Sequence, residues 1–223
     1  HVMRFWPIDS DMPTLVTPSG GIVRSAEPPL WMGGRGGGLH RSDGSLGPRQ
    51  WITERWDYCR RNVKSSALPD TCIPQDQSPS EAALDFLDEA TALAAGHRPC
   101  EVRQAPEAQE FIKLWQVSHG PSAETWADID QVLHRERLDQ FGRKRTQQVL
   151  FQDLPDGCMF RDAAGCFLNL GGRSALWSTR GYVATAAAHK PAAVVDVLTP
   201  KAVVELLRAG YEPDIHESIL AVL

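Results

Sequence analysis

The clearest hydrophobic pattern in the chain predicts a helix that ends at Gly96. Apolar residues recur on one stripe between Ala83 and Ala94, and the run at residues 78–81 has capping-box spacing with proline at its second position. Gly96 supplies the left-handed residue that ends many helices, and Pro99 blocks continuation. We therefore expect a helix that begins at about residue 79 and ends at Gly96.

Two further helices are predicted directly after this one. Apolar residues at one-face spacing favour a helix over residues 106–118, which the Gly-Pro pair at 120–121 ends. Ser122 can cap the next helix, whose apolar stripe runs from Trp126 to Leu138 and stops at Gly142. The middle of the chain is thus expected to be helical.

The last third of the chain changes its period and predicts strands. Short apolar runs at 158–160, 166–170 and 173–178 are separated by glycine-containing turns, which is typical of a β-meander. Residues 193–198 predict another strand. Thr199-Pro200 then opens a helix that reaches Arg208.

The first third is rich in proline and glycine and predicts little regular structure. Residues 14–17 and 21–24 are strand-like and can pair as a hairpin. Residues 51–58 alternate between large apolar and polar side chains, which favours a half-buried strand. Residues 64–77 are expected to be an exposed loop.

Together these elements predict an α+β fold. It consists of an irregular N-terminal arm with a hairpin, a three-helix middle, and a small antiparallel β-meander with a C-terminal helix. The length of 223 residues fits a single compact domain, 1–223, and a subdivision into 1–146 and 147–223 is the alternative.

Composition narrows the class of protein. The chain is 42% hydrophobic and 23% charged, which is ordinary for a globular protein, and it contains no apolar run long enough for a membrane span. Its five cysteines are an odd number, which favours reduced thiols and a cytoplasmic location. No secretory signal is visible. We expect no membrane partner and no cofactor, and the sequence leaves the oligomeric state open.

A glycine-rich run around Arg35 is the most unusual segment. The amides of Gly36, Gly37 and Gly38 can converge on an anion, with charge added by Arg35 and Arg41. The run matches neither the phosphate-loop motif nor the dinucleotide-binding motif. A flexible glycine loop is the competing explanation.

Residues directly after this run carry the chemistry of a hydrolase. His40, Ser42, Asp43 and Ser45 place an imidazole, two hydroxyl groups and a carboxylate close together. Our first hypothesis is therefore a small-molecule hydrolase for an ester or lactone. His40 would be its general base, Ser42 or Ser45 its nucleophile, and glycine amides would stabilise the oxyanion. The GxSxG motif is missing, and a turn at Asp43-Gly44 is the alternative reading.

A basic cluster supports a second hypothesis, a nucleic-acid-associated module. The cluster consists of Arg135, Arg137, Arg143, Lys144 and Arg145, which could contact phosphate groups. A net charge of −5 opposes this hypothesis, and a solvated helix face explains the cluster as well. A non-catalytic interaction protein is the third hypothesis.

Soft metal ligands are present without metal-binding spacing. Cys59, Cys72, His97 and Cys100 could supply four zinc ligands, but no CxxC or CxxxC pair occurs. We therefore expect core thiols and no metal.

The run from Phe86 to Cys100 resembles the end of the zinc-binding domain of Ada-type alkyl-DNA response proteins. In that domain a second cysteine follows three residues after the first, whereas residues 101–103 here are Glu-Val-Arg. The resemblance thus implies an Ada-like element without zinc.

A longer resemblance, to a group of uncharacterised bacterial proteins, includes residues 17–20, 154–157, 198–200 and 208–211. It implies that the two halves of the chain belong together, and it implies no activity.

Overall fold

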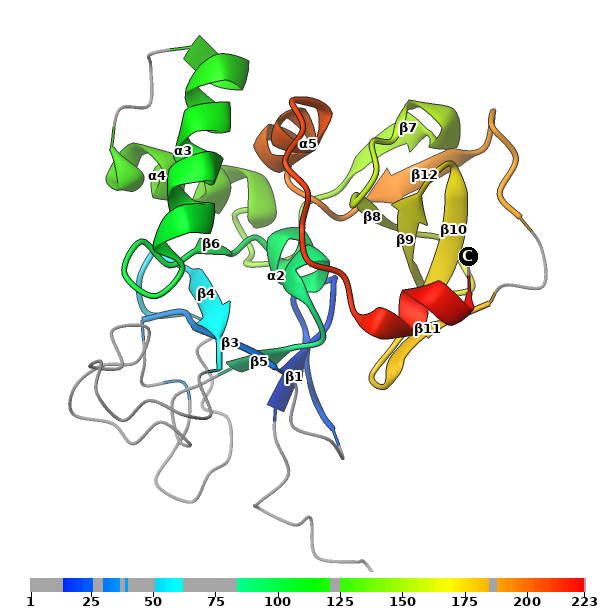
Figure 1. The fold of residues 1–223 in the computed structure, drawn as a ribbon, viewed down its shortest axis with the longest axis horizontal. Helices are drawn as coiled ribbons and strands as arrows, with labels where there is room; N and C mark the ends of the chain where they lie inside the picture. Colours follow the sequence, from blue (N-terminus) through cyan, green and yellow to red (C-terminus); the bar gives the residue numbers. More distant parts are fainter. Residues whose placement is uncertain are drawn as a thin grey trace, which may run out of the picture.

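The computed structural model of the protein describes residues 14–25, 30–36, 39, 51–61, 84–120, 125–184 and 188–222. These residues form an α+β fold, as predicted, and their strands make two sheets where one small sheet and a hairpin were expected (Figure 1). Within them, no helix combines the length and the apolar character that crossing a bilayer requires.

The first sheet has six strands in the order β2-β1-β5-β3-β4-β6. The predicted N-terminal hairpin is confirmed, because β1 and β2 pair antiparallel. The β1–β5 and β4–β6 pairs are parallel, and β3 lies antiparallel between β5 and β4. The strands are β1 (Thr14–Val16), β2 (Ile22–Arg24), β3 (Trp31–Gly34), β4 (Asp57–Arg60), β5 (Leu84–Phe86) and β6 (Arg98–Pro99).

The second sheet is antiparallel and has the order β11-β10-β9-β8-β12-β7. It contains the predicted meander, with β9 and β10 joined by Gly171 and Gly172, whose φ angles of 59° and 68° suit the tight hairpin turn. The strands are β7 (Gln147–Leu150), β8 (Met159–Arg161), β9 (Cys166–Leu170), β10 (Arg173–Ser178), β11 (Gly181–Val183) and β12 (Val194–Val197).

The helices are α2 (Glu89–Ala95), α3 (Ala105–His119), α4 (Trp126–Arg137) and α5 (Lys201–Arg208), with short 3-10 helices η2 (Phe151–Asp153) and η3 (Glu217–Ala221). Helix α5 contacts α3 and α4 and lies between them and the second sheet (Figure 1). One hydrophobic cluster includes Val16 of the first sheet, Phe160 of the second, and Tyr211 beyond α5. The two sheets therefore share a core.

Two buried carboxylates at the start of α2 fasten the C-terminal segment to this core. Glu89 accepts hydrogen bonds from the Tyr58 hydroxyl, from the Tyr211 hydroxyl at 2.6 Å and from the Asp214 amide at 2.8 Å. Asp88 accepts from the Tyr182 hydroxyl at 2.7 Å. Burial raises the pKa of both carboxyl groups.

The predicted start of the first helix is wrong, although its end at Gly96 is confirmed. Leu84–Phe86 is strand β5, and α2 begins only at Glu89. Asp88 caps the helix by accepting a hydrogen bond from the Thr91 amide at 2.8 Å. Residues 78–81 lie outside the described part of the chain. The apolar stripe predicted a helix there, but the residues before Asp88 form a strand that pairs with β1 on one side and β3 on the other.

Two other boundaries also differ. Of residues 51–58, only the last two belong to a strand, β4, and the Trp56 indole instead donates to the Thr53 carbonyl at 3.0 Å. Helix α4 stops at Arg137 rather than Gly142, since Leu138 is extended and pairs with Lys144. Its capping residue is Thr125, and Ser122 lies outside the described residues.

The glycine-rich run begins inside the first sheet. Gly33 and Gly34 belong to β3, where Gly33 pairs with Tyr58 and Leu84, so this part is not a loop. A Cβ atom on Gly33 would collide with the Asp57 carbonyl and lie 2.9 Å from the Phe86 ring. Glycine is therefore required there by the close approach of the neighbouring strand.

We expect Gly33→Ala to lower the free energy of unfolding by about 2–3 kcal/mol, because β4 must move to admit the methyl group. Urea denaturation measures the change. Gly21→Ala is the control, since its Cβ would meet only the Thr17 hydroxyl at 3.4 Å. Equal stability of the two variants would contradict the close strand contact.

Candidate functional site

A serine, a histidine and an aspartate form a hydrogen-bonded chain on the second sheet. The Ser174 hydroxyl lies 2.8 Å from His189 Nδ1. The other ring nitrogen, His189 Nε2, lies 3.0 Å from Asp162 Oδ2. These are the side chains and contacts of a nucleophile, a general base and an orienting acid.

The turn after β8 holds the Asp162 carboxylate in place. Its Oδ1 atom accepts hydrogen bonds from the amides of Ala164 at 2.7 Å and Gly165 at 3.3 Å, which leaves Oδ2 for the imidazole. Partial burial opposes ionisation, yet these amides and His189 together lower the pKa of Asp162 below its usual value. The carboxylate is thus ionised at neutral pH.

Aromatic packing fixes the orientation of the His189 ring. Its centroid lies 4.8 Å from that of Phe167 and 4.9 Å from that of Phe160, both in edge-to-face geometry. Phe151 packs against it at 5.4 Å. A ring held between three aromatic side chains cannot turn freely, so its two nitrogens keep their separate partners.

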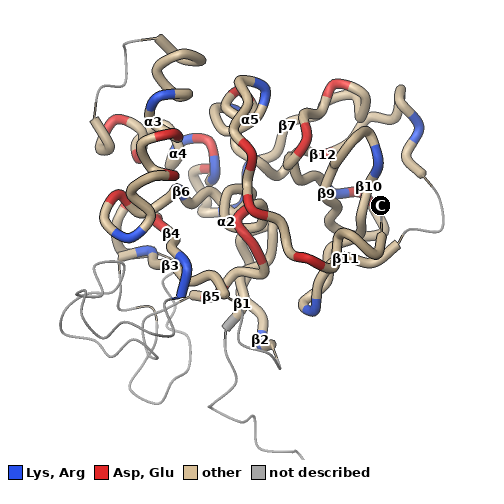
Figure 2. Tube along the Cα trace, viewed as in Figure 1, with Lys and Arg blue, Asp and Glu red and all other residues tan. Residues whose placement is uncertain are grey.

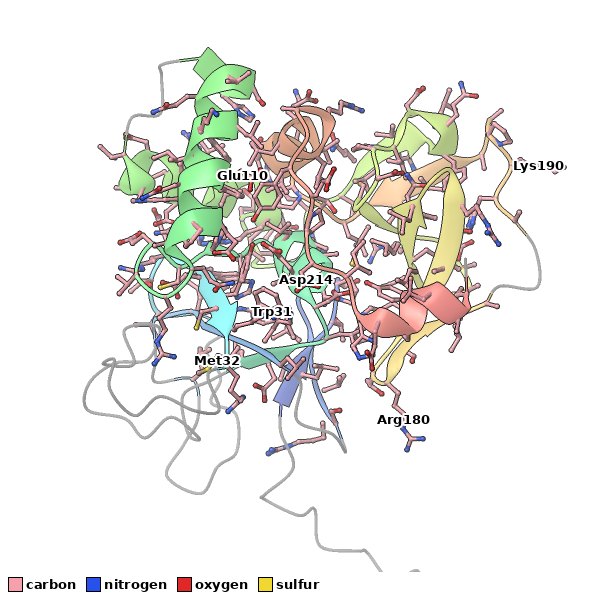
Figure 3. The ribbon with its side chains drawn as sticks, viewed as in Figure 1. Trp31, Met32, Glu110, Arg180, Lys190 and Asp214 are labelled. Carbon is pink, nitrogen blue, oxygen red and sulfur yellow. The ribbon has the colours of Figure 1, made fainter. Side chains whose placement is uncertain are left out.

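The carboxylate selects the tautomer that a general base needs. An ionised Asp162 only accepts hydrogen bonds, so His189 Nε2 carries the proton and Nδ1 presents its lone pair to the Ser174 hydroxyl. The Asp162 side chain is 37% exposed, and Lys190, the residue after His189, lies at the periphery of the molecule (Figure 3). Solvent therefore reaches this end of the chain of hydrogen bonds.

The catalytic residues predicted from the sequence, His40, Ser42, Asp43 and Ser45, lie outside the described residues, and so do Gly37, Gly38 and Arg41. Of the predicted ligand-binding set, the structure describes Arg35 and Gly36.

Arg35 points into the protein interior. Its side chain donates to His97 Nε2 at 3.3 Å and to the Gly20 carbonyl at 3.1 Å, and it is 1% exposed. Its guanidinium carbon lies 4.1 Å from the centroid of the Trp56 ring. Arg35 therefore lies in the interior, and its role in binding an anion stays a prediction.

The predicted basic cluster divides into buried and exposed residues. Arg137 is fully buried, with its guanidinium carbon 3.8 Å from the same Trp56 ring. Lys144 donates to the Ala94 carbonyl at the end of α2. Arg135 and Arg145 are exposed, and Arg143 pairs with Asp139 at 2.9 Å.

A single exposed face made of all five cations is thus not formed. Helix α4 also carries acidic residues, two in its first half and Glu136 between the two arginines of its last turn (Figure 2).

Arg35, Arg137, Lys144 and His97 therefore form a buried cationic cluster beside Trp56. Burial lowers the pKa of Arg35 and of Arg137 to about 9, so both stay charged at neutral pH. Burial, with repulsion from the two arginines, lowers the pKa of Lys144 to about 7. Burial and Arg35 also hold the pKa of His97 well below its usual value, so His97 is neutral.

The residues weighed as zinc ligands have other partners. His97 accepts from Arg35, and the Cys100 amide donates to the Tyr58 carbonyl where β6 meets β4. The Cys59 sulfur is buried and accepts from Arg103 at 3.9 Å, and Cys72 lies outside the described residues. Among the residues that the structure describes, no three histidine, cysteine or acidic side chains are grouped to hold a metal ion.

Comparison with known proteins adds no assignment. No protein-family model matches this chain, and no curated protein and no solved structure matches it either. The resemblance to Ada-type proteins stays a prediction. A functional argument must therefore start from the side chains themselves.

Proposed function

We propose that the protein is a serine hydrolase that cleaves a small ester or lactone through Ser174, His189 and Asp162. The observation that carries the proposal is the continuous chain of two contacts, at 2.8 and 3.0 Å, that joins the serine to the aspartate through the imidazole. The reaction class agrees with the first hypothesis from the sequence. The residues differ, and the role of His40, Ser42, Asp43 and Ser45 stays a prediction.

The proposed reaction follows the order of these contacts. The Ser174 oxygen attacks the carbonyl carbon of the substrate while its proton moves to His189 Nδ1. The C–O bond to the leaving group breaks, and the leaving alkoxide takes that proton from Nδ1. Water then attacks the acylated serine by the same route, which releases the carboxylic acid and restores the hydroxyl. Asp162 stabilises the imidazolium at each stage.

Covalent capture of the nucleophile tests the proposal. A fluorophosphonate reacts with an activated serine, with loss of fluoride, and peptide mass spectrometry locates the adduct. We expect phosphonylation of Ser174, loss of labelling in Ser174→Ala, and normal labelling in Ser178→Ala, a matched change in the same strand. An adduct on Ser42 or Ser45 would move the active site to the sequence-predicted cluster, and the lack of any adduct would refute the proposal.

A further inference from the structure

Two buried N–H groups in the cationic cluster have no acceptor within the part of the chain that the structure describes. Arg35 donates to His97 Nε2, so the neutral imidazole carries its proton on Nδ1. That Nδ1 atom is buried and has no hydrogen-bond partner among the described residues, and the same holds for Arg137 Nε. Since an unsatisfied buried donor is costly, each of these atoms calls for an acceptor.

Backbone carbonyl groups hold two cations of the cluster, Arg137 and Lys144. Within the described ranges, neither Arg137 nor Lys144 forms an ion pair with a carboxylate, and their oxygen partners are the backbone carbonyls of Gly96, Glu54 and Ala94. The Asp130 carboxylate acts on Arg137 through its charge, but it is paired with Arg98 at 2.8 Å. Carbonyl dipoles satisfy donors without neutralising buried charge.

We propose that the cluster of Arg35, His97, Arg137 and Lys144 beside Trp56 binds a small oxyanion of the phosphate type. Guanidinium, ammonium and imidazole N–H donors together match the tetrahedral array of acceptors on phosphate. This inference does not depend on the hydrolase site, because its residues lie next to strands of the first sheet, in α4 and in the segment after α4.

Lys144 is the most exposed member of the cluster. Lys144 is half-buried, as are His134, which contacts Arg137 at 3.0 Å, and Trp51, whose ring lies 5.7 Å from that of His134. Arg35, His97 and Arg137 are buried behind them. An anion would therefore meet Lys144 first, and this residue is the best one to change.

Calorimetric titration with sodium phosphate at pH 6.5, at constant ionic strength set with sodium chloride, tests the site. The pH lies below the pKa of about 7 of Lys144, so its ammonium group keeps its proton. We expect saturable binding of phosphate to the wild-type chain and an increase in its melting temperature over chloride alone. Wild-type chain that binds phosphate no better than chloride would overturn the proposal, whatever the variants do.

Two variants locate the binding. Lys144→Gln should weaken phosphate binding about tenfold or more, the loss expected for one charge-assisted hydrogen bond. Arg145→Gln removes the same charge from the exposed neighbouring residue and should change affinity less than twofold. Equal weakening in both variants would show a general surface effect of charge and would overturn the site. Circular dichroism spectra check that both variants keep the wild-type fold.

Discussion

Ser174→Ala is expected to lower kcat/KM for hydrolysis of a p-nitrophenyl ester about 10³-fold or more. The substitution removes the oxygen that attacks the carbonyl and leaves the strand intact, because the hydroxyl contacts only His189 among the described side chains. Initial rates of p-nitrophenol release, measured over a range of ester concentrations, give kcat/KM for each variant. His189→Gln should reduce the rate to a similar extent, since nucleophile and base act as one unit.

Asp162→Asn separates a positioning role from a structural one. The asparagine keeps an oxygen for the Ala164 amide, so we expect a melting temperature close to that of the wild-type chain. Its amide nitrogen would donate to His189 Nε2, which forces the proton onto Nδ1 and removes the lone pair that faces Ser174. The rate should therefore fall about 10²- to 10⁴-fold in a stable, folded protein.

Two controls make these results decisive. Ser178→Ala removes a hydroxyl from the same strand, where it donates to the Gly181 carbonyl, and should leave the rate within twofold of wild type. His40→Gln tests the cluster predicted from the sequence. If activity falls with His40→Gln and survives His189→Gln, the catalytic chain described above is only a structural contact.

Local signals explain which parts of the fold could be predicted. Gly96 ends α2 with a φ of 94°, and Gly120 follows the end of α3. Both helix ends could be predicted because a glycine after an apolar stripe ends the helix that directly precedes it. The β9–β10 hairpin could be predicted for the same reason, since Gly171 and Gly172 determine its turn. These features depend on residues adjacent in the sequence.

Features that depend on distant partners could not be predicted. Leu84–Phe86 becomes a strand because β1 and β3 lie on either side of it, and no local pattern shows those neighbours. Gly33 looked like part of a flexible loop because the strand that crowds it, β4, lies beyond residues 35–56. Tertiary pairing overrode local propensity in both places.

The candidate site was missed for the same reason. Ser174 and His189 are 15 residues apart, and His189 and Asp162 are 27 apart, so only the folded meander brings them together. Arg35 and Arg137 were assigned to two different hypotheses, yet both contact the Trp56 ring. Residues 40–45 were predicted as a catalytic cluster because they are close in the sequence. Catalytic groups, however, usually come from segments that are far apart in the sequence.

Arg98→Met is expected to lower the free energy of unfolding by about 3–5 kcal/mol. Arg98 joins β6 to α4 through a bidentate pair with Asp130, at 2.8 and 2.9 Å, and its guanidinium carbon lies 4.4 Å from the Trp126 ring. The arginine is 1% exposed and Asp130 is 6% exposed. Removal of the cation leaves the buried Asp130 carboxylate without its hydrogen-bonded counter-charge, and this loss is the main cost of the substitution. Urea denaturation of the variant measures the loss.

Two further variants separate the cost of the unpaired buried carboxylate from a general effect of removing an arginine. Arg143→Met breaks the exposed pair with Asp139 and should cost less than about 1 kcal/mol. Adding Asp130→Leu to Arg98→Met removes the stranded carboxylate, so the double variant should be more stable than Arg98→Met alone. If the second substitution destabilises the protein further, the penalty of Arg98→Met arises from lost packing on Trp126, and the buried pair contributes little to the link between β6 and α4.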